Sequence, residues 1–464
     1  MATIPEDYVK EQAVHRNIAA FFKGNNLCQL LRKINAYKSR GIPVVQVIQY
    51  LVQLAFTHKS MYMNMLNGTN AAGFARDVVY RLLNAPYINW SFFLLNLAAA
   101  VTGNIASLTG GSRLNALIVD DTMYERLRSK KVELLANVYD HAAKGKNKFK
   151  RGFRLLTMGW SDGVTFIPLL YRHMSSAEKE NRYNEISAKL DKRSVGYRIR
   201  QEAVSKSTDV LLSMLKQVKK IGIASRHVVF DSWFSFPATM ISIVKVGFDV
   251  VGRLKNTPKI KYMVNGQKQT LKGIYAANKK RRGRAKCLLS TEVLLYNGDG
   301  ETLPARIIFV RDRNNRKKWV AFACTDMTLT EEQAIQLYGK RWDIEVFFKV
   351  CKSYLNLARE FQGLSYDCVT AHTAIVMTRY IILAVNKRQN EDPRSLGELF
   401  FLTCDELQDT PFADVLARIL TLLHAVLEDC LTLTDQQIDD LLDRFIAKFS
   451  ECFKLSLPQP CLCA

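Results

Sequence analysis

Two short apolar runs that each end abruptly in aspartate constrain the fold of this chain most strongly. The first run covers residues 114–119 and leads into Asp120 and Asp121, and the second covers residues 227–230 and leads into Asp231. Short runs rich in valine, isoleucine and leucine are typical of strands that are buried on both faces of a sheet. We therefore expect an α/β fold in which two buried strands carry carboxylates to one edge of a sheet.

A third acid lies among cations in the segment that begins at Tyr338 and ends at Lys352. If the segment is one α-helix, Tyr338, Arg341, Glu345, Lys349 and Lys352 share a face, because residues three, four and seven apart are neighbours. A carboxylate among phosphate-binding groups suits a helix that brings a phosphate to a metal ion. The same spacing also fits an ordinary amphipathic helix with solvated ion pairs. The two strand-end aspartates favour the first interpretation, a site of three carboxylates.

The order of these motifs resembles that of a known family. Asp-Thr, then Asp, then Tyr-x-x-Arg-x-x-x-Glu-x-x-x-x-x-x-Lys is similar to the DDE transposases of cut-and-paste bacterial insertion sequences, in the YREK-signature group (insertion-sequence family four type). The matching residues are Tyr338, Arg341, Glu345 and Lys352, with Trp342 and Lys349 also common in the group. The resemblance covers residues 114–352. It implies a ribonuclease-H-like catalytic core, a mixed sheet with helices, that is interrupted by a mostly β insertion.

The resemblance also implies a chemistry. Asp121, Asp231 and Glu345 would be the catalytic acids and would hold two Mg²⁺ ions, or Mn²⁺ in their place, because hard oxygen ligands suit these cations. Two such ions activate a nucleophile and stabilise the leaving oxygen of an in-line phosphoryl displacement. Asp121 is preferred to Asp120 because the Asp-Thr pair matches the family pattern. Asp120 is interpreted as a cap or as a neighbour of the site.

Several other side chains are expected to contact DNA near the scissile bond. Arginine binds phosphate with a planar fork and lysine binds it as a point charge. Trp233 and Trp342 can stack on a flipped base, although both also suit a protein core. The full set of expected DNA contacts is Tyr338, Arg341, Trp342, Lys349, Lys352, Trp233, Arg253 and Lys255.

The charge of the chain agrees with a polyanionic partner. Its 464 residues carry a formal net charge of +23, and lysine and arginine that neutralise phosphates gain affinity by releasing condensed counterions. Double-stranded DNA is the expected partner, and an anionic membrane surface is the weaker alternative. Polar or charged residues interrupt the apolar stretches 92–108 and 368–385, which we interpret as buried helices rather than membrane spans. The amino terminus shows no secretory signal, so we expect a cytoplasmic, nucleoid-associated protein.

Cations and aromatic residues are interleaved in the segment 126–154. This composition suits a groove that follows a phosphate backbone, although a solvated loop has the same composition. The next residues, 153–174, alternate around an Asp-Gly pair at 162–163 and predict a β-hairpin.

Patterns along the chain predict five regions. The amino-terminal region is helical and would bind DNA, a β-rich insertion divides the catalytic core, and a helical carboxyl-terminal region would support a homodimer in the DNA complex. The predicted boundaries are 1–112 for the amino-terminal region, 113–247 for the first part of the core, 248–328 for the insertion, 329–364 for the last part of the core and 365–464 for the carboxyl-terminal region.

Three functions fit these observations. An active transposase would cut an insertion sequence from donor DNA and join its 3′-hydroxyl ends to target DNA. A catalytically silent DNA-binding protein would keep the fold, but the three intact acids argue against it. A metal-dependent nuclease would hydrolyse DNA without joining it, and only end joining to a target separates it from the transposase.

Overall fold

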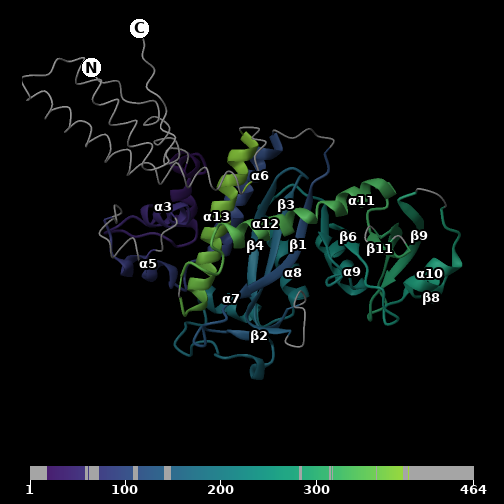
Figure 1. The fold of residues 1–464 in the computed structure, drawn as a ribbon, viewed down its shortest axis with the longest axis horizontal. Coiled ribbons are helices and arrows are strands. Elements are labelled where there is room, and N and C mark those ends of the chain that lie inside the picture. Colours follow the sequence, from purple (N-terminus) through teal and green to yellow (C-terminus); the bar gives the residue numbers. More distant parts are fainter. Residues whose placement is uncertain are drawn as a thin grey trace, which may run out of the picture. The chain divides into compact units, whose positions relative to one another are not determined.

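The architecture is a mixed α/β fold built on one large mixed sheet, as the computed structural model shows (Figure 1). The structure describes residues 18–57, 61, 73–107, 113–140, 148–281, 285–312, 315, 317–361, 363–389 and 396. Within these residues the strands join in the order β2-β3-β1-β5-β6-β11-β10-β9-β7-β8, and β4 pairs with β3. The predicted α/β class and mixed sheet are confirmed.

One half of the sheet carries the two apolar runs that end in aspartate. Its strands are β1 (Ala116–Glu125), β2 (Ala136–Tyr139), β3 (Phe149–Ser161), β4 (Phe166–Met174), β5 (His227–Phe230) and β6 (Asp249–Arg253). Strand β3 runs antiparallel to β1 and pairs on its other side with β2 and β4. On the opposite side of β1, strand β5 and then β6 run parallel to it. Both apolar runs are therefore buried neighbouring strands, as predicted, and the hairpin of β3 and β4 is confirmed.

The other half of the sheet is antiparallel. Its strands are β7 (Tyr262–Val264), β8 (Gln267–Gln269), β9 (Cys287–Tyr296), β10 (Thr302–Arg311) and β11 (Trp319–Cys324). Strand β11 pairs antiparallel with β6, and β10 and β9 continue the sheet outward. The predicted change to β structure between residues 248 and 326 is confirmed, while the boundaries of the five regions stay a prediction.

Helices precede, interrupt and follow the sheet. They are α2 (Leu27–Lys33), α3 (Val44–Leu54), η1 (Ala55–Thr57), α5 (Arg76–Leu83), α6 (Trp90–Ser107), η2 (Lys179–Asn181), α7 (Val195–Ala203), α8 (Ser207–Ile221), α9 (Pro237–Val246), α10 (Leu271–Ala277), α11 (Glu331–Gly339), α12 (Trp342–Ser353) and α13 (Tyr366–Gln389). The described part of the amino-terminal region is helical, as predicted. Residues 1–17 and, except for residue 396, all those after 389 lie outside the described residues, and so does the predicted dimerisation region beyond α13.

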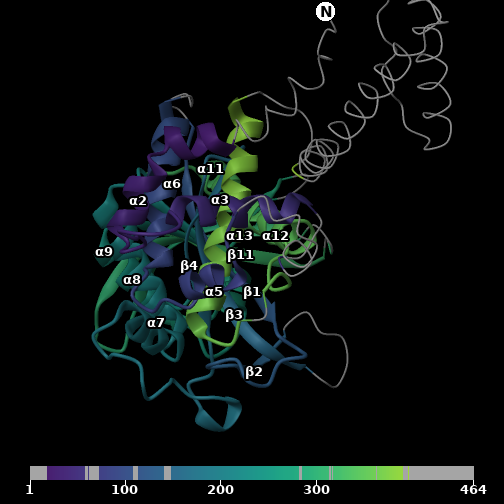
Figure 2. The ribbon, with the colours of Figure 1, turned by 90° about the vertical axis from the view of Figure 1, so that its left-hand side faces the viewer.

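Helix α13 is a buried helix of the core. It packs against α6, α12 and β4 (Figure 2). Both α6 and α13 have the length and hydropathy of a membrane span, but nearly all of α13 is buried within the protein. The guanidinium of Arg379 on α13 donates to the carbonyls of Val52 and Leu355, each at 3.1 Å, and pairs with Glu360. These contacts fasten α13 to the amino-terminal helices and to the segment after α12.

The segment from Tyr338 to Lys352 is two helices, and the prediction of one continuous helix is wrong. Helix α11 ends at Gly339 and α12 begins at Trp342. Between them the N–H groups of Lys340 and Arg341 bond to carbonyls three residues earlier, at 3.2 and 3.0 Å. Both residues keep right-handed helical backbone angles, so the two helices are joined by a tight turn of the 3₁₀ type. Tyr338 therefore lies on a different helix from Glu345.

A buried arginine joins three segments that are distant in the sequence. Arg200 of α7 is 2% exposed. Its guanidinium donates to both oxygens of Glu133, at 2.8 and 2.7 Å, and to both oxygens of Asp367, at 2.9 and 2.7 Å. Bidentate arginine–carboxylate pairs are among the strongest hydrogen bonds in proteins. This cluster holds the loop before β2 and the start of α13 against α7.

Candidate active site

Asp120 and Asp231 lie beside each other where β5 ends. The register of parallel strands β1 and β5 pairs Val119 with Phe230, and the residue that follows each of them is an aspartate. Burial raises the pKa of the Asp120 carboxyl to about 6, and the charges of Asp121 and Asp231 add to the rise against the opposing charge of Arg341. A carboxylate in this position is stabilised by a cation.

Arg341 joins Asp120 to Glu345. One of its terminal nitrogens lies 3.1 Å from Asp120 Oδ2 and the other lies 2.5 Å from Glu345 Oε1. The guanidinium also lies 5.9 Å from the ring centre of Tyr338, whose pKa burial raises to about 12. Two carboxylates from β1 and α12 are thus set to share one positive group. The sequence predicted that a helical glutamate lies near strand-end acids. In the structure, Glu345 of α12 and Asp120 of β1 both contact Arg341.

Asp121 points away from this group. Successive side chains of a strand lie on opposite faces, and Asp121 forms an ion pair with Arg154 of β3. The residues on either side of it, Asp120 and Thr122, contact Arg341 and Lys352 of the α12 segment. The geometry therefore favours Asp120 over the predicted Asp121 as the partner of Asp231 and Glu345.

The expected DNA-binding residues fall into two groups. The first group lies at the acids: Lys352 donates to Thr122 Oγ1 at 2.7 Å, and burial lowers the pKa of its ammonium. Arg253, at the end of β6, is exposed and acts electrostatically on Tyr338. The second group consists of exposed side chains: Trp233, Lys255, Trp342 and Lys349. Trp233 and Trp342 are 51% and 63% exposed, so neither is a core residue.

Sequence reasoning did not find the residues that anchor the start of α12. Lys340 donates to the carbonyls of Leu114 and Asp162, at 2.5 and 2.7 Å. Asp343 accepts a hydrogen bond of 2.5 Å from the hydroxyl of Ser161 in the β3–β4 turn. Both anchors flank Arg341 and fix its helix against the hairpin. The Asp-Gly pair revealed the turn, but no sequence signal links that turn to α12.

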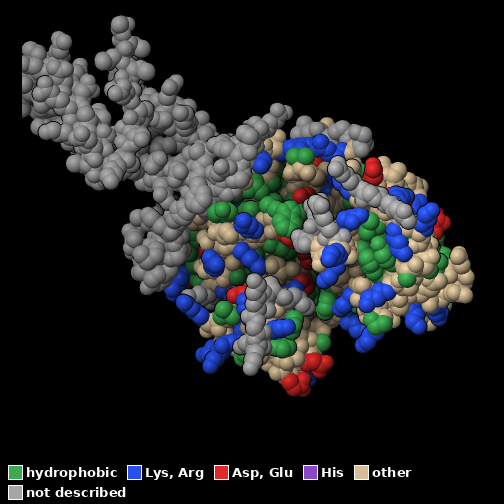
Figure 3. Space-filling view, turned by 45° about the vertical axis from the view of Figure 1, so that its right-hand side comes forward, with side chains coloured by type: hydrophobic (Ala, Val, Ile, Leu, Met, Phe, Trp, Pro, Cys, Tyr) green, Lys and Arg blue, Asp and Glu red, His purple; other side chains and the backbone are tan. Residues whose placement is uncertain are grey.

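Oxygen ligands at this site suit a divalent metal ion. Asp120, Asp231 and Glu345 are hard donors of the type that Mg²⁺ and Mn²⁺ prefer. Burial is the main cause of the raised pKa of Asp120, and the charges of Asp121 and Asp231 add to it, so a bound cation would favour the charged carboxylate. In Figure 3, acidic side chains lie in a hollow near the middle of the view, with Lys and Arg side chains on both of its sides.

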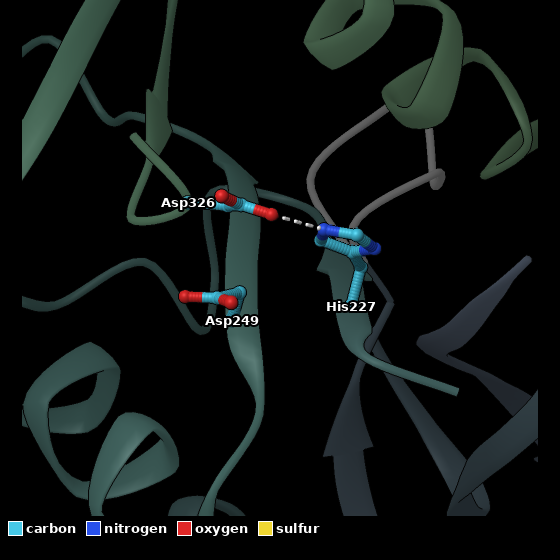
Figure 4. A group of neighbouring side chains, drawn as sticks. All are labelled: His227, Asp249 and Asp326. Atoms are coloured by element: carbon cyan, nitrogen blue, oxygen red, sulfur yellow. Dashed lines mark hydrogen bonds and ion pairs between the residues drawn. The ribbon is translucent and has the colours of Figure 1, made fainter. Parts of the chain in front are cut away.

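A second group of metal-ligand type lies at the opposite end of β5. The ligand atoms of His227, Asp249 and Asp326 all lie within 4.8 Å of one another. His227 Nε2 is 2.9 Å from Asp326 Oδ2, and the two side chains point toward each other (Figure 4). Arg226 pairs with both aspartates, at 2.8 and 3.4 Å. His227 and Arg226 thus bind these carboxylates, and the group connects β5, β6 and the residues after β11.

Comparisons with known proteins bear on the acids directly. A family model described as "DDE superfamily endonuclease" matches residues 51–269, and one described as "Transposase DDE domain" matches residues 186–377. The chain carries a DDE transposase/endonuclease domain. The first match includes Asp120, Asp121 and Asp231, and the second includes Asp231 and Glu345. Such a domain implies a metal-dependent phosphoryl-transfer enzyme.

Searches of structures and curated proteins add little. A solved structure titled "Drosophila P element transposase strand transfer complex" matches at 10% identity, covers 91% of this chain and 98% of its own, and has a TM-score of 0.22. That score is too low to carry an argument about the DDE domain. The search of curated proteins found no match.

Proposed function

We propose that this protein is a DNA transposase of the YREK-signature group with a ribonuclease-H-like core. The strand order β4-β3-β1-β5-β6, with β3 antiparallel and β5 and β6 parallel to β1, supports that core. The protein cuts an insertion sequence from donor DNA and joins the freed 3′-hydroxyl ends to target DNA. The observation that carries the proposal is the pairing of Asp120 and Glu345 with Arg341, with Asp231 beside Asp120, within the matched domain.

Asp120, Asp231 and Glu345 would hold the metal ions. When bound, two Mg²⁺ ions, or two Mn²⁺ ions, supply an activated nucleophile and stabilise the leaving oxygen. Asp120 takes the role that the family pattern suggested for Asp121, because Asp121 lies on the other face of β1 with Arg154. Lys340 and Asp343 keep the first turn of α12 in place, so that Glu345 stays on the side of Asp120.

Arginine and lysine side chains around the acids would bind and orient the DNA. Arg341 and Arg253 offer planar forks for phosphates, and Lys352 offers a point charge beside them. Lys349, Trp342 and Trp233 are exposed and accessible to a duplex that lies across α12. The partner is double-stranded DNA at the transposon ends and the target. A homodimer in the DNA complex and a cytoplasmic, nucleoid-associated location belong to the same proposal.

Cleavage and strand transfer of labelled transposon-end DNA with Mg²⁺ test the proposal. The substrate carries the element's own end and flanking DNA, and an Asp231→Ala variant is assayed beside the wild type. We expect cleavage followed by joining to target, with both lost in the variant and in excess chelator. Cleavage without joining would identify a nuclease instead. Binding without metal-dependent cleavage would identify a silent DNA-binding protein.

A further inference from the structure

Three aromatic side chains stand exposed at the edge of the sheet formed by β2 and the start of β3. Tyr139, Phe149 and Tyr183 are 37%, 57% and 41% exposed, and we call them the edge aromatics. The rings of Tyr139 and Phe149 meet edge to face, with centres 5.5 Å apart. Tyr183 is fastened by a hydrogen bond of 3.1 Å from its hydroxyl to Asn137 of β2. Large aromatic surfaces exposed together on a soluble protein indicate a binding site.

Cations accompany the edge aromatics. The ammonium of Lys148 lies 5.9 Å from the ring centre of Tyr139, and the guanidinium of Arg151 lies 5.5 Å from that of Tyr183. The strand register pairs Tyr139 with Phe149 and Asn137 with Arg151, so these side chains share one face of the β2–β3 ribbon. Lysine and arginine next to accessible rings are the combination that binds single-stranded nucleic acid, because the cations contact phosphates and the rings stack on bases.

The edge aromatics adjoin the strand that carries the acids. Arg154 pairs with Asp121 through its Nε and Nη2 atoms and donates from Nη1 to the carbonyl of Tyr139 at 3.4 Å. Phe149 also shares its face of β3 with Thr157, which is paired with Asp120 on β1. Arg154 thus links the edge aromatics to the strand that carries the acids, while the face of β3 between Phe149 and Thr157 is covered, with Phe153 buried against Tyr366 of α13.

We propose that the edge aromatics bind unpaired bases of single-stranded DNA. This inference rests on the proposed function, which requires a DNA strand to be cut at these acids. The charge of Lys148 and Arg151 complements the phosphate backbone, and the ring of Phe149, the most exposed of the three, stacks on a base. Stacking tolerates any base because every base has a π face, so the site selects for unpaired DNA rather than for a sequence.

Fluorescence anisotropy with the full-length protein and labelled oligothymidine, in chelator so that no cleavage occurs, tests the inference. We expect Phe149→Ala to weaken single-strand binding by about tenfold, and Tyr139→Ala to act in the same direction. Phe149→Trp, which keeps a stacking ring, retains wild-type affinity. A duplex of equal length, bound by charge, shows less than about a twofold change. Phe92→Ala, which removes an exposed aromatic from α6, serves as the control and leaves both affinities unchanged.

Unchanged single-strand affinity in Phe149→Ala would overturn the inference, and so would an equal loss on the duplex. Either result leaves the proposed function standing, because metal-dependent cleavage of end DNA is measured separately. If the wild-type protein binds single-stranded DNA but does not cleave end DNA in Mg²⁺, the proposed function alone is refuted.

Discussion

Replacing Asp120 by asparagine is expected to lower DNA cleavage by about 10³-fold, the loss that follows when several kcal/mol of metal-borne transition-state stabilisation are removed. The substitution keeps the size of the side chain and its contact with the backbone N–H of Asp121, but removes the charge that faces Arg341 and Asp231. Single-turnover cleavage of transposon-end DNA measures the effect. Affinity for the same DNA in chelator should stay within about threefold, because Asp120 binds no phosphate in this account.

Asp121→Asn is the matched control. Asp121 sits next in the chain and is paired with Arg154 on the other face of β1. Its loss removes one partly exposed ion pair, so we expect a decrease in cleavage of less than about tenfold. If Asp121→Asn abolished cleavage while Asp120→Asn retained it, the assignment from the family pattern would stand and the one from the geometry would fail.

Removing the guanidinium of Arg200 is expected to destabilise the fold by about 3–5 kcal/mol. Arg200→Met keeps most of the side-chain volume but leaves the buried carboxylates of Glu133 and Asp367 without their shared partner. Urea unfolding followed by circular dichroism measures the change in the free energy of unfolding. In hydrogen exchange, the amides at the start of α13 and in the loop before β2 should lose protection first, because both segments depend on this cluster.

Arg193→Met is the control for the arginine. Arg193 also pairs with an aspartate, Asp191, but its side chain is 92% exposed. Exposed pairs contribute little, so we expect a change within about 0.5 kcal/mol. An equal free energy of unfolding in the two variants would show that the Arg200 cluster does not stabilise the fold.

Much of the fold follows from local patterns. The mostly apolar runs before Asp120 and Asp231 predicted buried neighbouring strands, because strands covered on both faces of a sheet are rich in valine, isoleucine and leucine. The Asp-Gly pair at residues 162–163 predicted the turn between β3 and β4, where Gly163 adopts a φ of +90° that suits glycine.

The sequence could not decide between Asp120 and Asp121, because a strand that is buried on both faces shows no alternation of polar and apolar residues. In a strand with one solvent-exposed face, polar and apolar residues alternate, and the alternation shows which side chains share a face. Residues 116–119 are all buried, and the run gives no such parity. Only the placement of Arg341 and Arg154 on opposite sides of β1 separates the two acids.

The turn between α11 and α12 was missed because it contains no proline and only one glycine, Gly339. Residues on both sides have good helical spacing, so the periodicity continues through the break. Tertiary contacts from Lys340 and Asp343 hold the start of α12 in place. These partners are distant in sequence, and spacing within the segment carries no information about them.

Binding of Mn²⁺ to the full-length protein, measured by isothermal titration calorimetry in the absence of DNA, tests which acids hold the metal ion. Asp120, Asp231 and Glu345 would form one metal centre, with Asp121 outside it. We predict binding by the wild type and by Asp121→Asn, and affinity at least about tenfold weaker in Asp120→Asn, since one charged ligand is lost. Binding that survives in Asp120→Asn but disappears in Asp121→Asn would contradict the account.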